Sequence, residues 1–468
     1  MKDLEAALQH CGFGAAAAAA KTELFRRCAA ALDTRGRVLS ESTRAYFVPG
    51  RIEVLGKHTD YAGGSSLIAA VDRGFCLLAA PASDSQVRIT DVVQGETMRF
   101  ALDAELRPPA GAWSNYPLTV ARRLVRNFPG TARGVELALA SDLPPAAGMS
   151  SSSALMVGIF FALADANGIW SHERFLPELS EPLQLAGYLA TIENGQSYGP
   201  LAGDRGVGTF GGSEDHTAIL CARPGFLRQY AYCPLRFQQE FALPAGWTFA
   251  LASSGVAAEK TGNVLEKYNR ASRLAAAVAQ LWRGATGSDA PHLAAIVQGW
   301  PDASQRLRAM LGGAAQGDFG PEELQHRLEH FLVENEQVIP AAGTALRAGD
   351  LPSFGRCVER SQRAAETWLG NQVPETIQLA AAARQLGAVA ASAFGAGFGG
   401  SVWALVQQRQ APEFLAAWQQ RYAERFPQHR QQAAFFASAA GPALCRISWP
   451  PGSAPLAAES VPLQSNRS

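Results

Sequence analysis

The sequence predicts an α+β fold, in which strands and helices mix without strict alternation. Short apolar runs separated by glycines, which are typical of strands and turns, fill much of residues 46–100. Apolar residues at helical spacing mark longer stretches, most clearly 1–33 and 260–282. Apolar residues make up 47% of the 468 residues, which is enough for a substantial core. A doubly wound sheet fits less well, because it needs a regular exchange of strand and helix.

The N-terminal half is predicted to begin with an Ala-rich helical region and to continue with short strands. Alternating apolar residues near 135–139 indicate a half-buried strand that ends at the following Asp-Leu-Pro-Pro segment. In chain order we expect helix over 1–33, strands over 46–48, 52–55, 67–71, 75–79, 87–89, 98–100 and 135–139, and helices over about 151–165 and 183–193.

A second segment is predicted to start near Thr217 and to be richer in helix. Strands are expected over 249–252 and 402–406, and helices over 260–282, over 284–345 with Gly-rich breaks near 312–320, and over 377–386. The tail is rich in Pro and Ser and is predicted to be loosely ordered. The expected division is therefore a helical extension (1–33), an N-terminal domain (34–216), a C-terminal domain (217–450) and a tail (451–468).

Charge and cysteine content narrow the partners and the compartment. Lys plus Arg and Asp plus Glu each total 41, and this zero net charge argues against nucleic acid and against a polybasic membrane contact. No apolar stretch reaches the roughly 18 residues of a membrane helix, and the first ten residues lack a signal core. The seven scattered cysteines include no CxxC. We expect a cytoplasmic protein with reduced thiols, and leave protein partners open.

The first of three glycine-rich motifs is PGRIEVLGKHTDYAGG at residues 49–64. It brings Arg51, Lys57, His58 and Asp60 into one strand-and-loop stretch. Donors and acceptors between glycines suit a polyhydroxylated ligand, because glycine lets a ligand approach the backbone. A surface hairpin with a charged turn explains these residues about equally well. The motif is not a Walker A loop, because its spacing is one residue too long and a histidine replaces Ser or Thr.

The second motif, PPAAGMSSSSA at residues 144–154, leads from a predicted strand into a helix that opens within the serines. Unpaired N–H groups and the positive dipole end at a helix start can hold phosphates, and a serine hydroxyl can ligate Mg²⁺. Simple serine capping is the plainer interpretation. Four consecutive serines exceed the need of one cap, and we therefore favour phosphate binding.

The third motif, SAFGAGFGGS at residues 392–401, matches GxGxxG by letter. A dinucleotide site needs a helix after the glycines, whereas a predicted strand follows here, and we reject a dinucleotide fold. A glycine turn and a backbone that closely approaches a ligand remain as alternatives.

Together and in this order, the three motifs resemble those of the GHMP kinase superfamily. The first is similar to the galactokinase-type signature, roughly GRxN-[LIV]-IG-[DE]-H-x-D-Y-x-GG. Further matching segments lie at 113–116, 193–194, 212–216 and 268–270, so the resemblance spans about residues 44–406. It implies a two-domain architecture: an N-terminal S5-like domain with a mixed sheet and helices, a C-terminal α+β domain, and an active site in the cleft between them.

The resemblance implies an ATP-dependent sugar 1-kinase that phosphorylates the anomeric hydroxyl of galactose or of a C6-modified relative. Asp215 matches the Asp of the family's G-x-x-D-Q segment and would orient or deprotonate that hydroxyl. Arg51 would steady the carboxylate and the moving phosphoryl group with a permanent charge. The implied sugar contacts are Arg51, Lys57, His58, Asp60, Gly212, Asp215 and Tyr268.

The same resemblance implies sites for ATP and Mg²⁺. Mg²⁺ is expected between Ser152, Glu193 and the phosphates, and Trp113 is expected to line the adenine pocket. The plainer interpretations are a solvated turn at Asp215, a helix-end acid at Glu193 and a core tryptophan. The loop expected to hold the phosphates comprises Gly148, Met149, Ser150, Ser151 and Ser152. Gly397, Gly399 and Gly400 are expected to shape the sugar and phosphate side of the site.

Three positions depart from the family pattern: Glu53 replaces Asn, Lys57 replaces an acid, and His216 replaces Gln. In galactokinases the acid at position 57 accepts a hydrogen bond from outer hydroxyls toward C6, whereas lysine only donates. One hypothesis is that Lys57 recognises an acceptor-rich substituent, such as the carboxylate of galacturonate. The other is that Lys57 pairs with Glu53, so that the two sites exchange roles.

Two alternatives to a galactokinase-type enzyme follow from the same residues. One is a regulator that binds ATP and sugar without turnover, and the other is a GHMP kinase for a non-sugar alcohol. The presence of Arg51, Ser152, Glu193 and Asp215 favours catalysis. The Gly-rich segment 195–208 is longer than expected and is either a lid over the sugar or an insertion without a role in the site, with the second slightly favoured.

Overall fold

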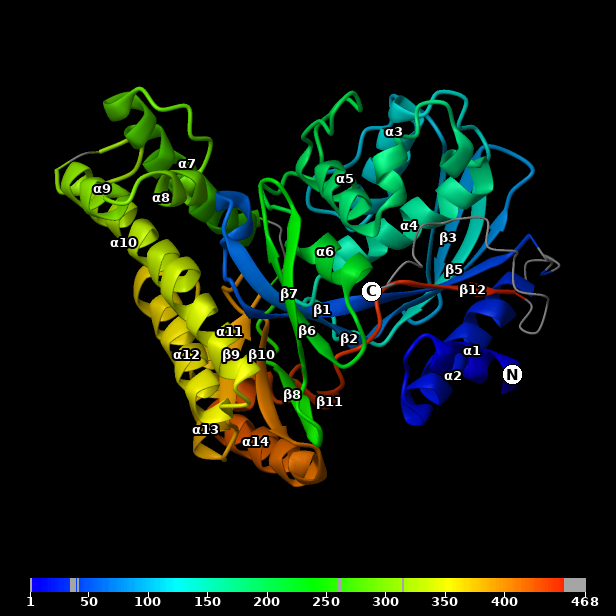
Figure 1. Ribbon diagram of the computed structural model, residues 1–468. Helices are drawn as coiled ribbons and strands as arrows, with labels where there is room; N and C mark the ends of the chain where they lie inside the picture. Colours follow the sequence, from blue (N-terminus) through cyan, green and yellow to red (C-terminus); the bar gives the residue numbers. More distant parts are fainter. Residues whose placement is uncertain (1, 34–38, 40–41, 259–261, 314, 450–468) are drawn as a thin grey trace.

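The computed structural model describes residues 2–33, 39, 42–258, 262–313 and 315–449. Two lobes are connected by long strands that run between them (Figure 1). The strands are β1 (Arg44–Leu55), β2 (Ser65–Pro81), β3 (Gln86–Asp91), β4 (Glu96–Ala101), β5 (Val135–Ser141), β6 (Phe226–Ala231), β7 (Arg236–Ala242), β8 (Trp247–Ser253), β9 (Ala390–Phe394), β10 (Ser401–Gln407), β11 (Ala434–Ser438) and β12 (Cys445–Ser448). The helices are α1 (Lys2–His10), α2 (Ala15–Asp33), α3 (Asn115–Asn127), α4 (Ser151–Asn167), α5 (Pro182–Asn194), α6 (Glu214–Cys221), α7 (Gly262–Thr286), α8 (Leu293–Gly299), α9 (Ala303–Leu311), α10 (Pro321–Leu332), α11 (Ile339–Arg347), α12 (Leu351–Ala364), α13 (Pro374–Gln385) and α14 (Ala411–Arg425).

The first sheet has the order β12-β1-β2-β5-β3-β4, and β6 pairs with both β2 and β7. Its neighbours are antiparallel except for the parallel pair β3 and β5, so the sheet is mixed. Strand β2 is long enough to pair with two different strands along one edge, since residues 65–68 pair with β6 and residues 75–81 pair with β5. The two long strands β1 and β2 thereby connect the outer part of the sheet to the region between the lobes.

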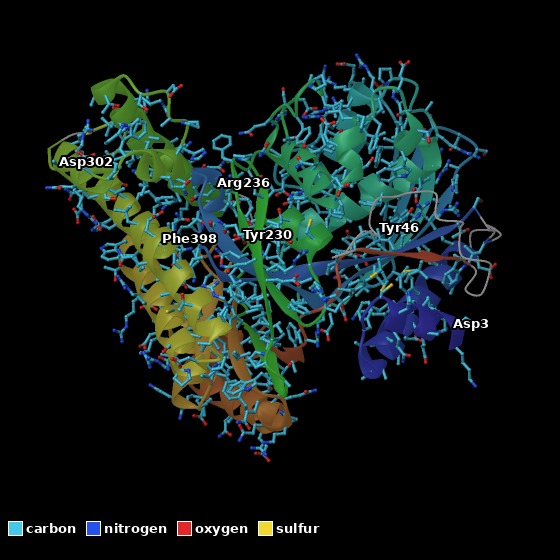
Figure 2. The ribbon with its side chains drawn as sticks, in the orientation of Figure 1. Asp3, Tyr46, Tyr230, Arg236, Asp302 and Phe398 are labelled. Carbon is cyan, nitrogen blue, oxygen red and sulfur yellow. The ribbon has the colours of Figure 1, made fainter. Side chains whose placement is uncertain are left out.

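Alternating residues send the apolar side chains of β1 to opposite faces of the sheet. Phe47 packs in a cluster with Phe25 of α2, whereas Tyr46 belongs to the core that includes Phe161 of α4. Tyr46 and Tyr230 both lie on the first sheet, and Asp3 and Asp302 lie at opposite ends of the molecule (Figure 2). The N-terminal helices therefore cover the sheet face opposite to α4.

The second sheet has the order β11-β8-β10-β9 and is antiparallel. Its alanine-rich face packs against α13 and α14 around Trp418. A separate helical cluster surrounds Trp282 of α7 and includes residues of α8, α9 and α10. Residues 395–400 connect β9 to β10 as a hairpin loop. The strand predicted after the third motif is therefore present as β10.

The α+β class, the mixed sheet and the helices of the N-terminal half are confirmed. The expected strand pairs over 46–55 and 67–79 each form one continuous strand, β1 and β2. The sequence analysis did not predict nine of the observed elements: α3, α6, α12, α14, β6, β7, β9, β11 and β12. The expected boundary at residue 217 does not coincide with the change of sheet, because β6, β7 and β12 all join the first sheet. The expected tail, 451–468, lies outside the described residues.

Within the described part of the chain, none of the helices has both the length and the apolar character needed to cross a membrane.

Candidate active site

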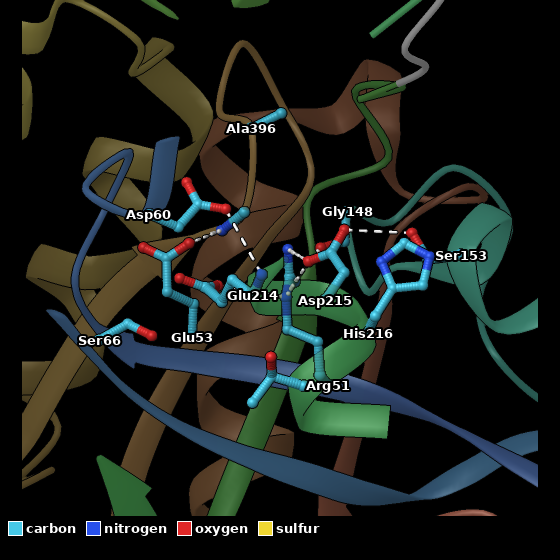
Figure 3. A network of polar contacts seen from close by, with 12 residues as sticks. Arg51, Glu53, Asp60, Ser66, Gly148, Ser153, Glu214, Asp215, His216 and Ala396 are labelled. Atoms are coloured by element: carbon cyan, nitrogen blue, oxygen red, sulfur yellow. Dashed lines mark hydrogen bonds and ion pairs between the residues drawn. The ribbon is translucent and has the colours of Figure 1, made fainter. Parts of the chain in front are cut away.

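The predicted catalytic pair is in contact. Asp215 lies in the first turn of α6, where the helix dipole favours a negative charge. Arg51 of β1 reaches its Oδ1 with Nε at 2.9 Å and Nη2 at 2.8 Å. Arg51 Nη1 also donates to the carbonyl oxygen of Gly148 at 2.7 Å (Figure 3). One guanidinium therefore connects the candidate catalytic carboxylate to the serine-rich loop.

The charge of Arg51 is secured by its neighbours. Burial alone would lower the pKa of this guanidinium, but Asp215, Glu214 and Glu53 outweigh burial and raise the pKa above its ordinary value. Arg51 therefore keeps its positive charge where it contacts Asp215 and the serine-rich loop.

The first cavity lies on one side of Asp215. It contains the predicted sugar contacts His58, Asp60, Gly212 and Tyr268 together with Arg51 and Asp215. Its described lining residues are Arg51, Glu53, His58, Asp60, Ala190, Glu193, Asn194, Thr209, Gly211, Gly212, Glu214, Asp215, His216, Tyr268, Gly395 and Ala396. We call it the sugar-side cavity.

Local packing explains several of these side chains. The His58 ring contacts Tyr61 Oη at 2.7 Å and the Ala396 carbonyl oxygen at 3.1 Å, which fixes its orientation. A Cβ atom on Gly212 would lie 2.5 Å from Asp60 Oδ2, so only glycine allows this close approach. The glycine before the catalytic segment is thus required by Asp60 rather than by a flexible turn.

Lys57 is buried beside the sugar-side cavity but is not among its lining residues. Its ammonium group donates to Ser361 Oγ of α12 at 2.9 Å, and Ser361 Oγ donates to Glu334 Oε1 at 2.9 Å. Glu334 Oε1 also accepts the Gly56 N–H at 2.7 Å. The side chain is therefore directed into the protein, toward α12.

Glu53, two residues beyond Arg51, does line the cavity. Its Oε2 accepts the Gly395 N–H at 3.3 Å, and its Oε1 is buried with no hydrogen-bond partner among the described residues. Burial raises the pKa of Glu53 to about 7, although the positive charges of Lys57 and Arg51 counteract part of this effect. Of positions 53 and 57, which both depart from the family pattern, position 53 therefore lines the cavity with an acid, and position 57 is not among the lining residues.

The second cavity lies on the other side of Asp215 and contains the predicted adenine and phosphate positions. Trp113, 39% exposed, lines it together with Tyr116. Gly148, Ser150, Ser151 and Ser152, just before and at the start of α4, line it as well. The described lining residues are Arg51, Phe75, Gly111, Ala112, Trp113, Tyr116, Ala146, Gly148, Ser150, Ser151, Ser152, Leu155, Asp215, Ala258 and Ala396. We call it the nucleotide-side cavity.

The serine loop has the features of an anion site. Ser150 precedes α4 in the left-handed conformation, and its Oγ is buried without a partner among the described residues. Together with the unpaired N–H groups at the start of α4, this hydroxyl can bind a phosphate oxygen. Met149 differs from its neighbours, since its side chain is in the hydrophobic core and its carbonyl oxygen accepts the Arg51 N–H at 3.2 Å.

The expected Mg²⁺ residues lie on the two sides of the catalytic pair. Ser152 lines the nucleotide-side cavity, and Glu193 lines the sugar-side cavity. Glu193 Oε2 accepts from Ser153 Oγ at 2.7 Å, and Ser153 Oγ also lies 3.3 Å from Asp215 Oδ2. Carboxylates and a serine hydroxyl beside a phosphate site suit Mg²⁺, which uses few protein ligands and takes the rest from phosphates. Sequence reasoning missed Ser153, although the fourth consecutive serine was the available signal.

Comparisons with known proteins agree with this geometry. The family models "Galactokinase galactose-binding signature", "GHMP kinases N terminal domain" and "GHMP kinases C terminal" match residues 37–81, 115–201 and 344–424. The chain is 29% identical over 391 residues to a galactokinase of Chloroflexus aggregans, covering 82% of this chain and 89% of that protein. It is 28% identical over 377 residues to a galactokinase of Roseiflexus sp., with 80% and 86% covered.

The chain is a galactokinase-like member of the GHMP kinase superfamily. The fold agrees with this assignment. A crystal structure of Lactococcus lactis galactokinase complexed with galactose superposes with a TM-score of 0.70 at 23% identity, over 86% of this chain and 95% of that chain.

In this galactokinase-like kinase, the third motif contributes through two residues. Gly395 and Ala396 line the sugar-side cavity. A Cβ on Gly397 would lie 2.3 Å from the Asn371 carbonyl oxygen, and one on Gly399 would lie 2.6 Å from the Val256 carbonyl oxygen. These glycines thus allow close packing within the protein rather than direct contact with a ligand.

The Gly-rich segment 195–208 of the kinase is docked on α3. Asp204 accepts from Arg122 Nε at 2.8 Å in a buried ion pair, and Arg123 donates to the Gln196 carbonyl oxygen at 2.8 Å. Its end is held as well, because Val207 N donates to the Glu193 carbonyl oxygen at 2.8 Å. The segment thus supports the position of Glu193 and leads directly into residues that line the sugar-side cavity.

Proposed function

We propose that this kinase transfers the γ-phosphoryl group of ATP to the anomeric hydroxyl of galactose. The observation that carries the proposal is the meeting of the two cavities at Arg51 and Asp215, which both cavities share. A sugar hydroxyl on one side and a terminal phosphate on the other would approach each other at this pair. Phosphoryl transfer requires mainly such positioning and charge neutralisation.

The residues divide the task between them. Asp215 accepts the hydroxyl proton or orients the hydroxyl for attack, and Arg51 stabilises both Asp215 and the negative charge on the transferred group. The start of α4 and the serines from Ser150 to Ser152 bind the phosphates. Mg²⁺, when bound, neutralises charge on the phosphate oxygens, and Ser152 and Glu193 are the residues proposed to hold it.

A neutral sugar fits the first cavity better than a uronic acid. Five carboxyl groups line the sugar-side cavity: Glu53, Asp60, Glu193, Glu214 and Asp215. Among its described lining residues, Arg51 and two histidines are the side chains that can carry positive charge. Walls rich in hydrogen-bond acceptors suit the hydroxyl groups of a sugar and disfavour a sugar that carries a carboxylate of its own. Because Lys57 points away from this space, we propose galactose rather than galacturonate.

The decisive experiment measures ADP release with galactose, galacturonate, glucuronate, glucose and mevalonate. Galactose is expected to give the highest kcat/KM. Asp215→Asn is expected to lower kcat by roughly 10²–10⁴-fold, because the base is lost while the ATP site is intact. Calorimetric ATP binding by this variant is expected to match wild type.

Three outcomes would contradict the proposal. Sugar binding without ADP release from any acceptor would indicate a regulator, and preference for mevalonate would indicate a different alcohol. Retained turnover in Asp215→Asn would remove Asp215 from its role. The intact Arg51–Asp215 contact supports catalysis over a purely regulatory function.

A further inference from the structure

Glu53 lines the sugar-side cavity and carries a buried carboxylate oxygen that has no hydrogen-bond partner among the described residues. The residue is 3% exposed, and only its Oε2 has a protein donor, the Gly395 N–H at 3.3 Å. Its Oε1 lacks a hydrogen-bond partner among the described residues. A buried polar atom in this state costs free energy and is uncommon in folded proteins. A hydroxyl group of a ligand in the cavity would supply the missing donor.

The position of Glu53 on β1 sets its distance from the reacting centre. Arg51, Ile52 and Glu53 pair in regular register with β2, so Arg51 and Glu53 point to the same face. Two residues along a strand correspond to about 7 Å. Since Arg51 holds Asp215, Glu53 lies about one sugar ring further from the transferred phosphoryl group. A sugar with its anomeric hydroxyl at Asp215 would therefore direct its opposite side toward Glu53.

The surroundings of Glu53 explain how this carboxylate can be kept in the cavity. Lys57 is buried outside the cavity lining and donates a hydrogen bond to Ser361, and its positive charge favours the ionised form of Glu53. Arg51 acts in the same direction, whereas Glu334 and Asp60 oppose it. The buried lysine thus supports an acid in the cavity and does not itself reach the ligand space.

We propose that Glu53 is the residue that selects the sugar in this kinase. Its Oε1 accepts a hydrogen bond from a hydroxyl on the side of the ring opposite the anomeric carbon, and Lys57 supports its charge from behind. The assignment rests on the proposed function, because it takes the acceptor to be a sugar bound at Asp215. It explains why an acid at position 53 and a lysine at position 57 occur together in this chain.

The test combines variants with sugars that each lack one hydroxyl. The initial rate of ADP release is measured with galactose and with 2-deoxy-, 3-deoxy-, 4-deoxy- and 6-deoxygalactose, using wild type, Glu53→Gln and Glu53→Ala. In wild type, one sugar that lacks a hydroxyl at C3, C4 or C6 is expected to lose at least about tenfold in kcat/KM relative to galactose. In Glu53→Ala that loss is expected to fall below about threefold, while the other losses stay unchanged. Glu53→Gln, which preserves the shape, is expected to give an intermediate loss.

Two further variants separate a direct contact from a structural role. Glu136→Gln changes a buried carboxyl on β5 that pairs with Arg88 away from the site, and it is expected to reproduce the wild-type losses. Lys57→Met is expected to reduce the selective loss only in part, because Glu53 remains in place. Should Glu53→Ala fail to fold, as judged by its melting temperature and ATP binding, Glu53→Gln carries the comparison.

Equal losses for every deoxysugar in wild type and both Glu53 variants would overturn the assignment while leaving the proposed function intact. A selective loss that vanishes in Lys57→Met but persists in Glu53→Ala would move the contact to Lys57. Failure of wild type to phosphorylate galactose or any deoxygalactose would overturn the proposed function, and this assignment with it.

Discussion

At the scale of single residues, direction matters as much as identity. Arg51 and Glu53 share one face of β1, and both line the sugar-side cavity. Lys57, four residues beyond Glu53, is directed into the protein and donates to Ser361. The motif therefore contributes a cation and an acid to the cavity. Lys57, which also departs from the family signature, does not line the cavity and acts through the effect of its charge on Glu53.

The ionisation of Glu53 makes stability depend on pH. The pKa of its carboxyl is about 7 in the folded protein, against 4.5 for an ordinary glutamate, mainly because of burial. Between these values the folded chain binds a proton that the unfolded chain has released, so the contribution of Glu53 to stability falls as the pH rises. The charged groups that interact electrostatically with it include Lys57, Arg51, Glu334, Asp60 and Glu214.

We therefore expect Glu53→Gln to melt close to wild type at pH 5 and a few degrees above it at pH 8. Gln is neutral at both pH values, whereas Glu53 becomes charged in wild type as the pH rises. The measurement is thermal unfolding of the ligand-free proteins across this range. A melting-temperature difference that stays constant from pH 5 to pH 8 would show that Glu53 does not titrate there.

Ser153 shows the limit of inference from motifs. The run of serines indicated more than a helix cap, but the sequence could not indicate which hydroxyl faces the nucleotide side and which faces the catalytic acids. In the structure Ser152 lines the nucleotide-side cavity, whereas Ser153 contacts Glu193 and Asp215. Consecutive residues of a helix point about 100° apart, so this choice depends on how α4 is seated.

At the scale of elements, α2 is connected to the region of the serine loop by a partly buried ion pair. Lys21, 2% exposed, binds Asp142, which follows β5 and whose side chain is 27% exposed. Asp142 Oδ1 also accepts the Gly74 N–H at 2.9 Å. The helical extension thus helps to fix the end of the strand that leads into the phosphate loop.

We expect Asp142→Ala to lower the free energy of unfolding by roughly 2–4 kcal/mol, because Lys21 would remain buried without its partner. The double variant Lys21→Met with Asp142→Ala is expected to recover part of this loss. Urea denaturation measures both effects. The exposed pair Arg26–Glu23 on the same helix is the control, and Glu23→Ala is expected to leave stability nearly unchanged. Equal losses for Asp142→Ala and Glu23→Ala would contradict a structural role of the buried pair.

Elements with a strong local signal were predicted from the sequence, and several elements defined by distant partners were not. α4 and α5 were expected almost at their observed bounds, and both are rich in apolar residues, which is a local signal. β6 and β7 were missed, since β7 is largely exposed and both strands gain their pairing from β2 and from each other. α6 was missed because it is short and has acids in its first turn, although it carries Asp215, the proposed catalytic carboxylate.

At the scale of the whole molecule, a strand from the C-terminal part of the chain lies beside the N-terminal elements. β12 pairs with β1, and α1 and α2 pack on the same sheet face. That face places Phe47, Leu78 and Ile447 against the helices. The N-terminal extension therefore acts as a cover for the first sheet rather than as an appendage.

Deletion of residues 1–33 is expected to expose this apolar face and to cause aggregation, because a contiguous apolar patch of this kind is uncommon on a folded monomer. Light scattering, binding of a hydrophobic dye and melting temperature measure the effect. Increased dye binding, a lower melting temperature and larger particles are expected relative to the full chain. A truncated protein that is monodisperse with an unchanged melting temperature would show that the extension is dispensable for the fold.

The sequence by itself determined the α+β class and the three glycine-rich motifs, because these depend on local patterns and residue types. The family, and with it the expectation that Arg51 steadies Asp215, followed from the resemblance of those motifs to the GHMP kinases. Only the tertiary structure decided that Glu53 lines the cavity while Lys57 does not, that Ser153 contacts Glu193 and Asp215, and that β12 joins the first sheet. These features depend on side-chain direction and on contacts between residues far apart in the chain, which motif spacing does not encode.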